Sequence, residues 1–190
     1  MIDAEGARQL AREYLAADLP RRWTHVQAVA ARAKELGGVV AEDRKVLVSA
    51  AWLHDIGYAP GLVDTGFHPL DGARFLRSRG LPDRVVRLVA HHTCAVVEAE
   101  ERGLAELLLR EFEREVSATA DLLWYCDLTT GPDGELVAVD ERLAEIRGRY
   151  GPGDVVTRFI ERATPELLAA AARGAELVEG ASRGTGRPCA

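Results

Sequence analysis

The sequence predicts an all-α protein, folded as a single domain of about seven to nine helices. Its 190 residues are rich in Ala, Leu, Glu and Arg, which are good helix formers. Apolar side chains recur at helical spacing along most of the chain. Proline and glycine residues fall between these periodic segments, where they begin and end helices. A chain of this length is sufficient for one hydrophobic core.

The individual helices follow from the same signals. The first is expected over residues 4–17, where Leu10 and Tyr14 lie on one face, and Pro20 occupies the first turn of the second. The last is expected to be interrupted at Thr164-Pro165. In chain order, the predicted helices cover residues 4–17, 20–36, 41–56, 69–80, 82–92, 95–110, 113–128, 140–149 and 154–178.

The remaining segments are predicted as connections. Residues 58–67 contain proline and glycine and are expected to form a loop, and residues 131–134 are expected to form a turn. Residues 136–139 are apolar and favour a short extended segment. The helical domain is expected to span residues 1–179. Residues 180–190, which are rich in Ser, Gly and Arg, are predicted to form a disordered C-terminal tail.

Charge and composition restrict the class of function. A net charge of −6 argues against general nucleic-acid binding, although it allows an arginine-lined pocket for a small phosphate. No apolar run is long enough to span a membrane, and the N-terminal residues lack the apolar stretch of a signal peptide. Cys94, Cys126 and Cys189 have neither pairing nor zinc-type spacing, which suits a reducing compartment. We therefore expect a cytoplasmic protein without membrane contact.

The pair His54-Asp55 is the first candidate for chemistry. It stands at the end of an apolar helical stretch, residues 46–57, so both side chains should be close to the core. An ionised carboxylate in that setting needs a partner, because burying a lone charge is costly. A divalent metal ion is the simplest partner. Imidazole and carboxylate together suit Fe, Mn, Co, Ni or Zn.

The pair belongs to an ordered set that resembles the HD superfamily of metal-dependent phosphohydrolases. His25 precedes it on a helix, and Asp127 follows it on a late helix. In that family a histidine, a His-Asp pair and a distant aspartate converge on one metal. The resemblance covers roughly residues 20–130. It implies an HD-type helical bundle with metal ligands His25, His54, Asp55 and Asp127.

Two further histidines suggest a second metal ion. The segment from Phe67 to Leu76 resembles the His-Pro-x-x-Gly-Ala segment of dinuclear members of the family, in which the histidine reaches into the site. This resemblance makes His68 a candidate ligand. The alternative is that His68 only begins a helix and that the protein is mononuclear.

The pair His91-His92, followed by threonine, also resembles a ligand segment of dinuclear members. On a helix, His92 shares a face with Val85 and Val89, whereas His91 lies on a more polar side with arginines. We therefore expect His92 to be the metal ligand. His91 is expected to face the substrate or to support the site.

The resemblance also implies the chemistry. One or two divalent transition metal ions activate a water molecule for attack on phosphorus and neutralise the phosphate oxygens. Asp55 is suited to bridge two metals and orient the attacking water. The guanidinium of arginine can donate two parallel hydrogen bonds to a phosphate group. The basic residues near the site are Arg74, Arg77 and Lys45. Arg74, on the helix after His68, is the favoured phosphate ligand.

The predicted function is hydrolysis of a phosphate ester or anhydride in a nucleotide or another small phosphorylated metabolite. A second hypothesis is an oxygenase, because some members of the superfamily with a dinuclear iron site use dioxygen on organophosphonates. A third is a regulatory module that binds a nucleotide or metal without turnover. Nothing in the sequence points to a particular oligomeric state.

Overall fold

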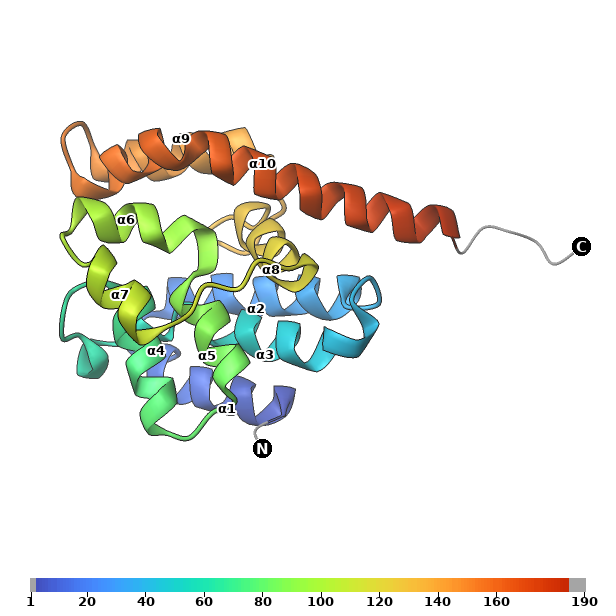
Figure 1. Ribbon diagram of the computed structural model, residues 1–190, viewed down its shortest axis with the longest axis horizontal. Coiled ribbons are helices and arrows are strands. Elements are labelled where there is room, and N and C mark those ends of the chain that lie inside the picture. Colours follow the sequence, from blue (N-terminus) through green and yellow to red (C-terminus); the bar gives the residue numbers. More distant parts are fainter. Residues whose placement is uncertain (1–2, 185–190) are drawn as a thin grey trace, which may run out of the picture.

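The computed structural model describes residues 3–184, and within this range the protein is all-helical, as predicted. Figure 1 shows the ten α-helices of the described chain. They are α1 (Ala4–Leu15), α2 (Pro20–Leu36), α3 (Arg44–Leu53), α4 (His68–Ser78), α5 (Asp83–Ala90), α6 (Ala95–Glu101), α7 (Ala105–Glu111), α8 (Ala118–Leu128), α9 (Val139–Tyr150) and α10 (Val155–Gly184). Four short 3₁₀ helices accompany them: η1 (Ala41–Asp43), η2 (Ile56–Tyr58), η3 (Pro60–Leu62) and η4 (His92–Cys94).

The structure has one α-helix more than the upper limit predicted, because the helix expected over 95–110 is two helices. Helix α6 ends at Glu101, and Gly103 adopts a positive φ of 69° before α7 begins. Glycine reaches this left-handed conformation without steric cost, so it ends the helix. The turn expected at 131–134 is present. Within residues 3–184, Leu136 forms only an isolated bridge with Thr130 rather than a strand.

The expectations for the C-terminal region were wrong in two respects. Helix α10 continues through Pro165 without interruption, because proline removes only one backbone donor and the neighbouring turns keep their hydrogen bonds. The helix also extends to Gly184, past the start of the expected tail, and the Ser182 hydroxyl donates to the Val178 carbonyl within it. The rest of the predicted tail, residues 185–190, lies outside the described residues.

Helix α3 lies at the centre of the fold. Its sequence is nearly all apolar, and Leu47, Ala50, Ala51 and Leu53 are fully buried. It packs against α1 and α2 and also contacts α5 and α8. Because a helix that is apolar on all sides requires cover on all sides, the sequence explains this central position. The pair His54-Asp55 directly follows α3 and is therefore held in the interior.

Helices α9 and α10 lie together on one side of this body. Figure 1 shows them above α8 and α6, with the C-terminal part of α10 extending past the other helices. Helix α10 packs mainly against α8, α9 and α6. Among the described residues, no helix has the length and apolar character needed to cross a membrane.

A close backbone contact joins η2 to α4. A Cβ atom on Gly57 would lie 2.0 Å from the carbonyl oxygen of His68 and 2.6 Å from the backbone nitrogen of Gly72. Only glycine permits this approach. The contact holds the first turn of α4 next to the segment after α3, and so places His68 beside Asp55.

Candidate metal centre

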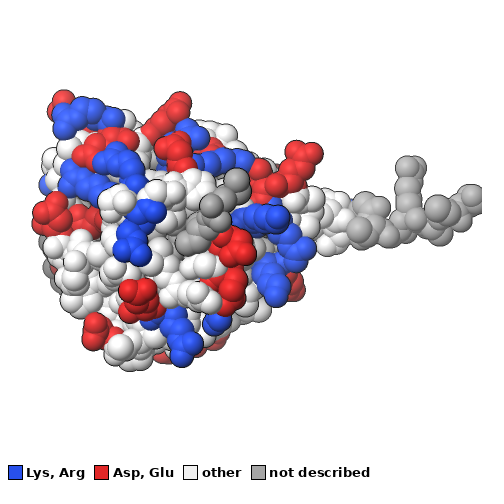
Figure 2. Space-filling model, turned by 90° about the horizontal axis from the view of Figure 1, so that it is seen from below, with Lys and Arg blue, Asp and Glu red and all other residues white. Residues whose placement is uncertain are grey.

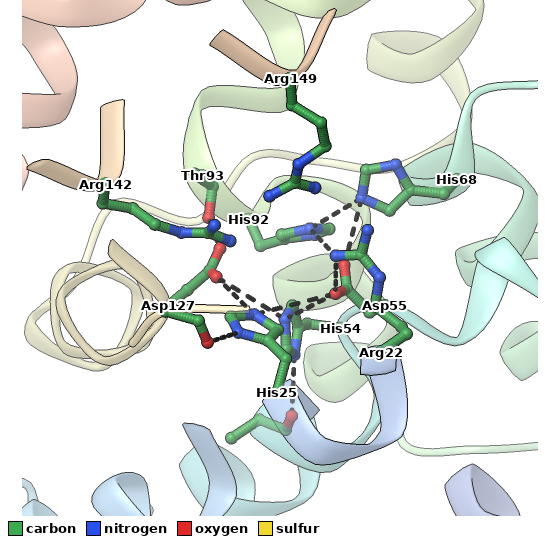
Figure 3. A network of polar contacts seen from close by, with 12 residues as sticks. Arg22, His25, His54, Asp55, His68, His92, Thr93, Asp127, Arg142 and Arg149 are labelled. Carbon is green, nitrogen blue, oxygen red and sulfur yellow. Dashed lines mark hydrogen bonds and ion pairs between the residues drawn. The ribbon is translucent and has the colours of Figure 1, made fainter. Parts of the chain in front are cut away.

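Six side chains from five regions of the fold converge in the interior. His25 comes from α2, His54 and Asp55 from the end of α3, His68 from the start of α4, His92 from η4 and Asp127 from α8. Figure 3 shows their rings and carboxylates pointing toward one another. These are the six residues that the sequence suggested as metal ligands, and the structure brings all of them together.

The first cluster consists of His25, His54 and Asp127, whose candidate ligand atoms all lie within 4.8 Å of one another. The Nε2 atom of His25 lies 3.0 Å from Oδ1 of Asp127, and the Nε2 atom of His54 lies 3.9 Å from the same oxygen. All three residues are buried. This cluster could hold one metal ion.

The second cluster consists of Asp55, His68 and His92 and satisfies the same distance limit. The Nε2 atom of His68 lies 3.4 Å from Oδ1 of Asp55 and 3.2 Å from Nε2 of His92. The His92 Nε2 atom lies 3.8 Å from the Asp55 oxygen. This cluster could hold a second metal ion.

The carboxylate of Asp55 connects the two clusters. Its Oδ1 atom faces His68 and His92, whereas its Oδ2 atom lies 3.4 Å from Nε2 of His54 and 3.9 Å from Nε2 of His25. The two oxygens therefore face different clusters, which is the arrangement of a carboxylate that bridges two metal ions. The guanidinium of Arg22 donates to Oδ2 over 2.7 Å.

Backbone carbonyl groups orient three of the imidazole rings. The Nδ1 atoms of His25, His54 and His92 lie 3.0, 2.8 and 2.7 Å from the carbonyl oxygens of Gly131, Ala51 and Val89, respectively. A ring nitrogen that faces a carbonyl oxygen must carry the proton and donate it. In the neutral ring the Nε2 lone pair then faces the cluster, as in the supporting shell of known metal sites.

The donor atoms fit a metal ion better than they fit one another. Because Nδ1 of His92 donates to Val89, its Nε2 atom is an acceptor, so the facing Nε2 atom of His68 either donates a proton to it or shares a cation with it. The Nε2 atom of His54 is buried and, within the described part of the chain, makes no hydrogen bond. Burying such a polar atom without a partner is costly. Imidazole nitrogens and carboxylate oxygens are together a suitable donor set for divalent transition metals.

Burial and the neighbouring charges together set the protonation of the side chains in the two clusters. Burial lowers the pKa of His68 and of His92, so both rings are neutral at neutral pH. Burial alone would raise the pKa of Asp55, but Arg22 and His54 outweigh it and hold that pKa well below its usual range. Burial opposes the charge on His54, yet Asp55 and Asp127 raise its pKa to about 9 without a metal ion. The negative charges of Asp55 and Asp127 thus favour a positive charge at the first cluster, whether a protonated His54 or a bound metal ion.

A pocket opens beside the second cluster. Its lining includes Asp55, His68, His92 and Asp127, whereas His25 and His54 lie behind it. Tyr58 also lines the pocket and stacks on the ring of His68, with ring centroids 3.9 Å apart. A small molecule in this pocket would therefore contact the second cluster directly.

Three arginines that sequence analysis missed also line the pocket: Arg22 from α2, and Arg142 and Arg149 from α9. Arg22 lies one helical turn before His25, so a search along that face of the helix would have found it. No sequence signal connects α9 to the site, because its position depends on the packing of α9 against α10.

Two residues proposed for catalysis lie elsewhere. The Nε2 atom of His91 is 2.8 Å from the carbonyl oxygen of Phe112, and the residue lies outside both clusters and the pocket lining. The expected substrate-facing role of His91 is therefore not supported. Arg74 is bound by Glu111, at 2.6 Å, and by Asp64, at 3.1 Å, and it does not line the pocket. These ion pairs occupy its guanidinium, so the structure does not favour Arg74 as the phosphate ligand.

Thr93 is a further residue that sequence analysis did not assign. It follows His92 in η4, and its hydroxyl donates to Oδ2 of Asp127, the carboxylate oxygen that does not contact His25. Thr93 has a φ of 46°, which is unusual for a β-branched residue. The strained backbone thus allows His92 to join the second cluster while the next residue, Thr93, orients Asp127.

Comparison with known protein families agrees with this geometry. A family model described as the HD domain matches residues 22–127, which include all six candidate ligands and end at Asp127. The match covers more than half of the chain. The protein therefore belongs to the HD domain family.

Two curated relatives share about half of the chain. A tRNA (cytidine(56)-2'-O)-methyltransferase from Picrophilus torridus is 31% identical over 104 residues, which are 52% of this chain and 30% of the relative. A protein of the same name from Thermoplasma volcanium is 35% identical over 103 residues, which are 52% of this chain and 28% of the relative. The match thus spans less than a third of these relatives. No solved structure matches the chain significantly.

Proposed function

We propose that this protein is a metal-dependent phosphohydrolase that cleaves a phosphate ester or anhydride in a nucleotide or another small phosphorylated metabolite. The observation that carries the proposal is the pair of His/Asp clusters connected by Asp55 and opening on one pocket. The ordered ligands within an HD domain support the same conclusion. A phosphate group fits this pocket because arginine side chains face it opposite the clusters.

Each group has a defined part in the proposed reaction. Divalent ions, when bound, polarise a water molecule and withdraw charge from the phosphate oxygens. Asp55 would offer one carboxylate oxygen to each cluster, and Arg22 keeps this carboxylate ionised. Arg142 and Arg149 line the same pocket and make it suitable for an anionic substrate. In the overall reaction, the water oxygen forms a bond to phosphorus, the bond from phosphorus to the leaving oxygen breaks, and the leaving oxygen gains a proton.

The relatives' name does not lead us to propose methyl transfer for this chain. Their shared stretch is about as long as the HD match here, so we propose that they carry a related HD unit within a longer protein. Their name does make tRNA a substrate worth testing. Figure 2 shows acidic and basic side chains interspersed over one face without a continuous basic band. Together with the net charge of −6, this favours a small substrate over general nucleic-acid binding.

The test has two stages, starting with protein purified without added metal. Elemental analysis should find close to two transition metal ions per chain. A panel of nucleoside mono-, di- and triphosphates, sugar phosphates and tRNA should then show phosphate release that is lost on chelation and restored by the same metal. Substrate-dependent dioxygen consumption by an iron-loaded protein would favour the oxygenase. Nucleotide binding without any product would favour the regulatory module.

A further inference from the structure

Helix α9 lies outside the stretch that matches the HD family, yet it contributes two arginines to the pocket. Figure 3 shows the guanidinium groups of Arg142 and Arg149 pointing from this helix toward the clusters, Arg142 on the side of Asp127 and Arg149 on the side of His92. We propose that these two arginines bind a second phosphate group of the substrate, next to the one that is cleaved. The inference rests on the proposed phosphohydrolase function and restricts the substrate to molecules with at least two phosphate groups.

The two arginines form one unit. They lie seven residues apart on α9, which is about two helical turns, so their side chains share a face. Glu145 lies between them on the same helix. It accepts from Arg142 at 2.7 Å and from Arg149 at 2.6 Å. The carboxylate of Glu145 thus holds both guanidinium groups in place before any ligand arrives, which lowers the entropy cost of binding an anion.

The charges around the pocket leave this unit positive. The other carboxylates that line the pocket have partners of their own. Asp55 is paired with Arg22 at 2.7 Å, and the buried Glu98 is paired with Arg102 at 2.6 Å. Asp127 contacts His25 at 3.0 Å and accepts from the Thr93 hydroxyl. In the described part of the chain, by contrast, Arg142 and Arg149 have only Glu145 as an ion-pair partner. Two guanidinium groups and one carboxylate carry a net charge of +1, which is exposed to the pocket.

Burial makes this excess charge significant. The side chain of Arg142 is only 7% exposed and that of Arg149 is 30% exposed, so water screens them incompletely. A buried guanidinium has unused donors unless it meets an acceptor. A phosphate group supplies several acceptor oxygens and compensates the charge.

The shape of the site extends the same argument. A second pocket, lined by Pro20, Arg21 and Pro132, meets the first at Arg22, Arg142 and Arg149. The three guanidinium groups therefore lie at the junction between the metal clusters and further space. Arg21 is itself paired with Asp133 at 2.8 Å. A substrate whose cleaved phosphate lies at Asp55 can place its next phosphate at this junction and its organic part beyond it.

The test compares two stable ligands on the metal-containing protein: methylenediphosphonate, which has two phosphonate groups, and methylphosphonate, which has one. Titration calorimetry should show tighter binding of the diphosphonate to the wild type. Because Arg149 is partly exposed, Arg149→Gln should fold normally. It should weaken diphosphonate binding about tenfold, the usual scale for one charge-assisted hydrogen bond, and change methylphosphonate binding less than about twofold. Arg149→Lys retains the charge but not the planar guanidinium, so its affinity for the diphosphonate should lie between those of the wild type and Arg149→Gln.

The matched control is Arg110→Gln, an exposed arginine on α7 outside both pockets, which should bind like the wild type. Equal weakening of both ligands by Arg149→Gln, or no weakening of either, would overturn the proposal. The outcome is separable from the proposed function. If diphosphonate binding depends on Arg149 but the protein releases no phosphate, the binding site stands and the hydrolase function is rejected. If the protein hydrolyses monophosphates and Arg149→Gln binds the diphosphonate like the wild type, the hydrolase function stands and the binding site is rejected.

Discussion

The two ligand clusters use the same side-chain chemistry but differ in their surroundings. In the first, His25 and His54 are 2% and 1% exposed, both rings are fixed by backbone carbonyl oxygens, and of the three residues only Asp127, at 12% exposed, lines the first pocket, while His25 borders the second. In the second, His68 is 13% exposed and stacks on Tyr58, and both histidines line the pocket. Burial and fixed ring orientation reduce the reorganisation needed for binding, so we expect the first cluster to retain its ion and the second to exchange its ion and contact the substrate.

The largest effect is expected from Asp55, because it belongs to both regions. Asp55→Ala should lose both ions and reduce phosphate release more than about a hundredfold, beyond the usual effect of removing a supporting residue. It should also cost roughly 3 kcal/mol of stability, because Arg22 is left as a largely buried, unpaired charge. Elemental analysis and urea denaturation measure the two effects.

Asp55→Asn separates the two contributions. The amide oxygen still accepts from Arg22, so stability should largely return while metal binding remains impaired. If Asp55→Ala kept two ions per chain, a bridging role for this carboxylate would be untenable.

The next effect distinguishes the clusters directly. After dialysis, His68→Ala should retain close to one ion per chain, because the buried first cluster is intact. His25→Ala should retain almost none, because all three residues of the cluster that remains line the first pocket, where its ion can exchange. Elemental analysis of both variants provides the comparison, and equal stoichiometry in the two would refute the difference in retention. His91→Ala is the control, since its ring contacts Phe112 rather than either cluster, and it should keep both ions.

A smaller loss of metal binding is expected from disrupting the backbone contact between Gly57 and His68, which positions the second cluster. Gly57→Ala places a methyl group 2.0 Å from the His68 carbonyl oxygen, and backbone atoms cannot move as a side chain can. We expect a loss of about 3 kcal/mol, at the upper end for overpacking, together with weakened binding of the second ion. Gly61→Ala is the matched control, because its added Cβ would meet nothing within 4 Å. Equal stability of the two variants would show that the contact does not position α4.

The sequence predicted the fold class and the convergence of the six candidate ligands because both depend on short-range patterns. Pro20 and Gly103 begin or end helices by their own backbone preferences, although Gly103 was not recognised as a break. The candidate ligands belong to an ordered motif. Helical periodicity also favoured His92 over His91, and the structure places only His92 in a cluster.

The arginines that line the pocket could not be predicted in the same way. Arg74 was favoured because it lies near His68 in the sequence. In the folded protein, however, it donates to Glu111, which lies 37 residues further along the chain. Arg142 and Arg149 lie 15 and 22 residues after Asp127, on a different helix, and they reach the pocket through the packing of α9 on α10. In a protein rich in arginine, ion pairs formed in the folded state decide which guanidinium groups remain available for a ligand.

The smallest effect concerns the orientation of Asp127 in the first cluster. Thr93→Val removes the hydroxyl that donates to this carboxylate but keeps the branched shape, so the backbone strain at its positive φ stays the same. Loss of such a supporting hydrogen bond should weaken metal binding about tenfold. Thr93→Ser keeps the hydroxyl and should bind metal like the wild type. Chelator competition should therefore release the first-cluster ion earlier from the valine variant alone. Early release from the serine variant alone would mean that the branched side chain, not the hydroxyl, supports Asp127.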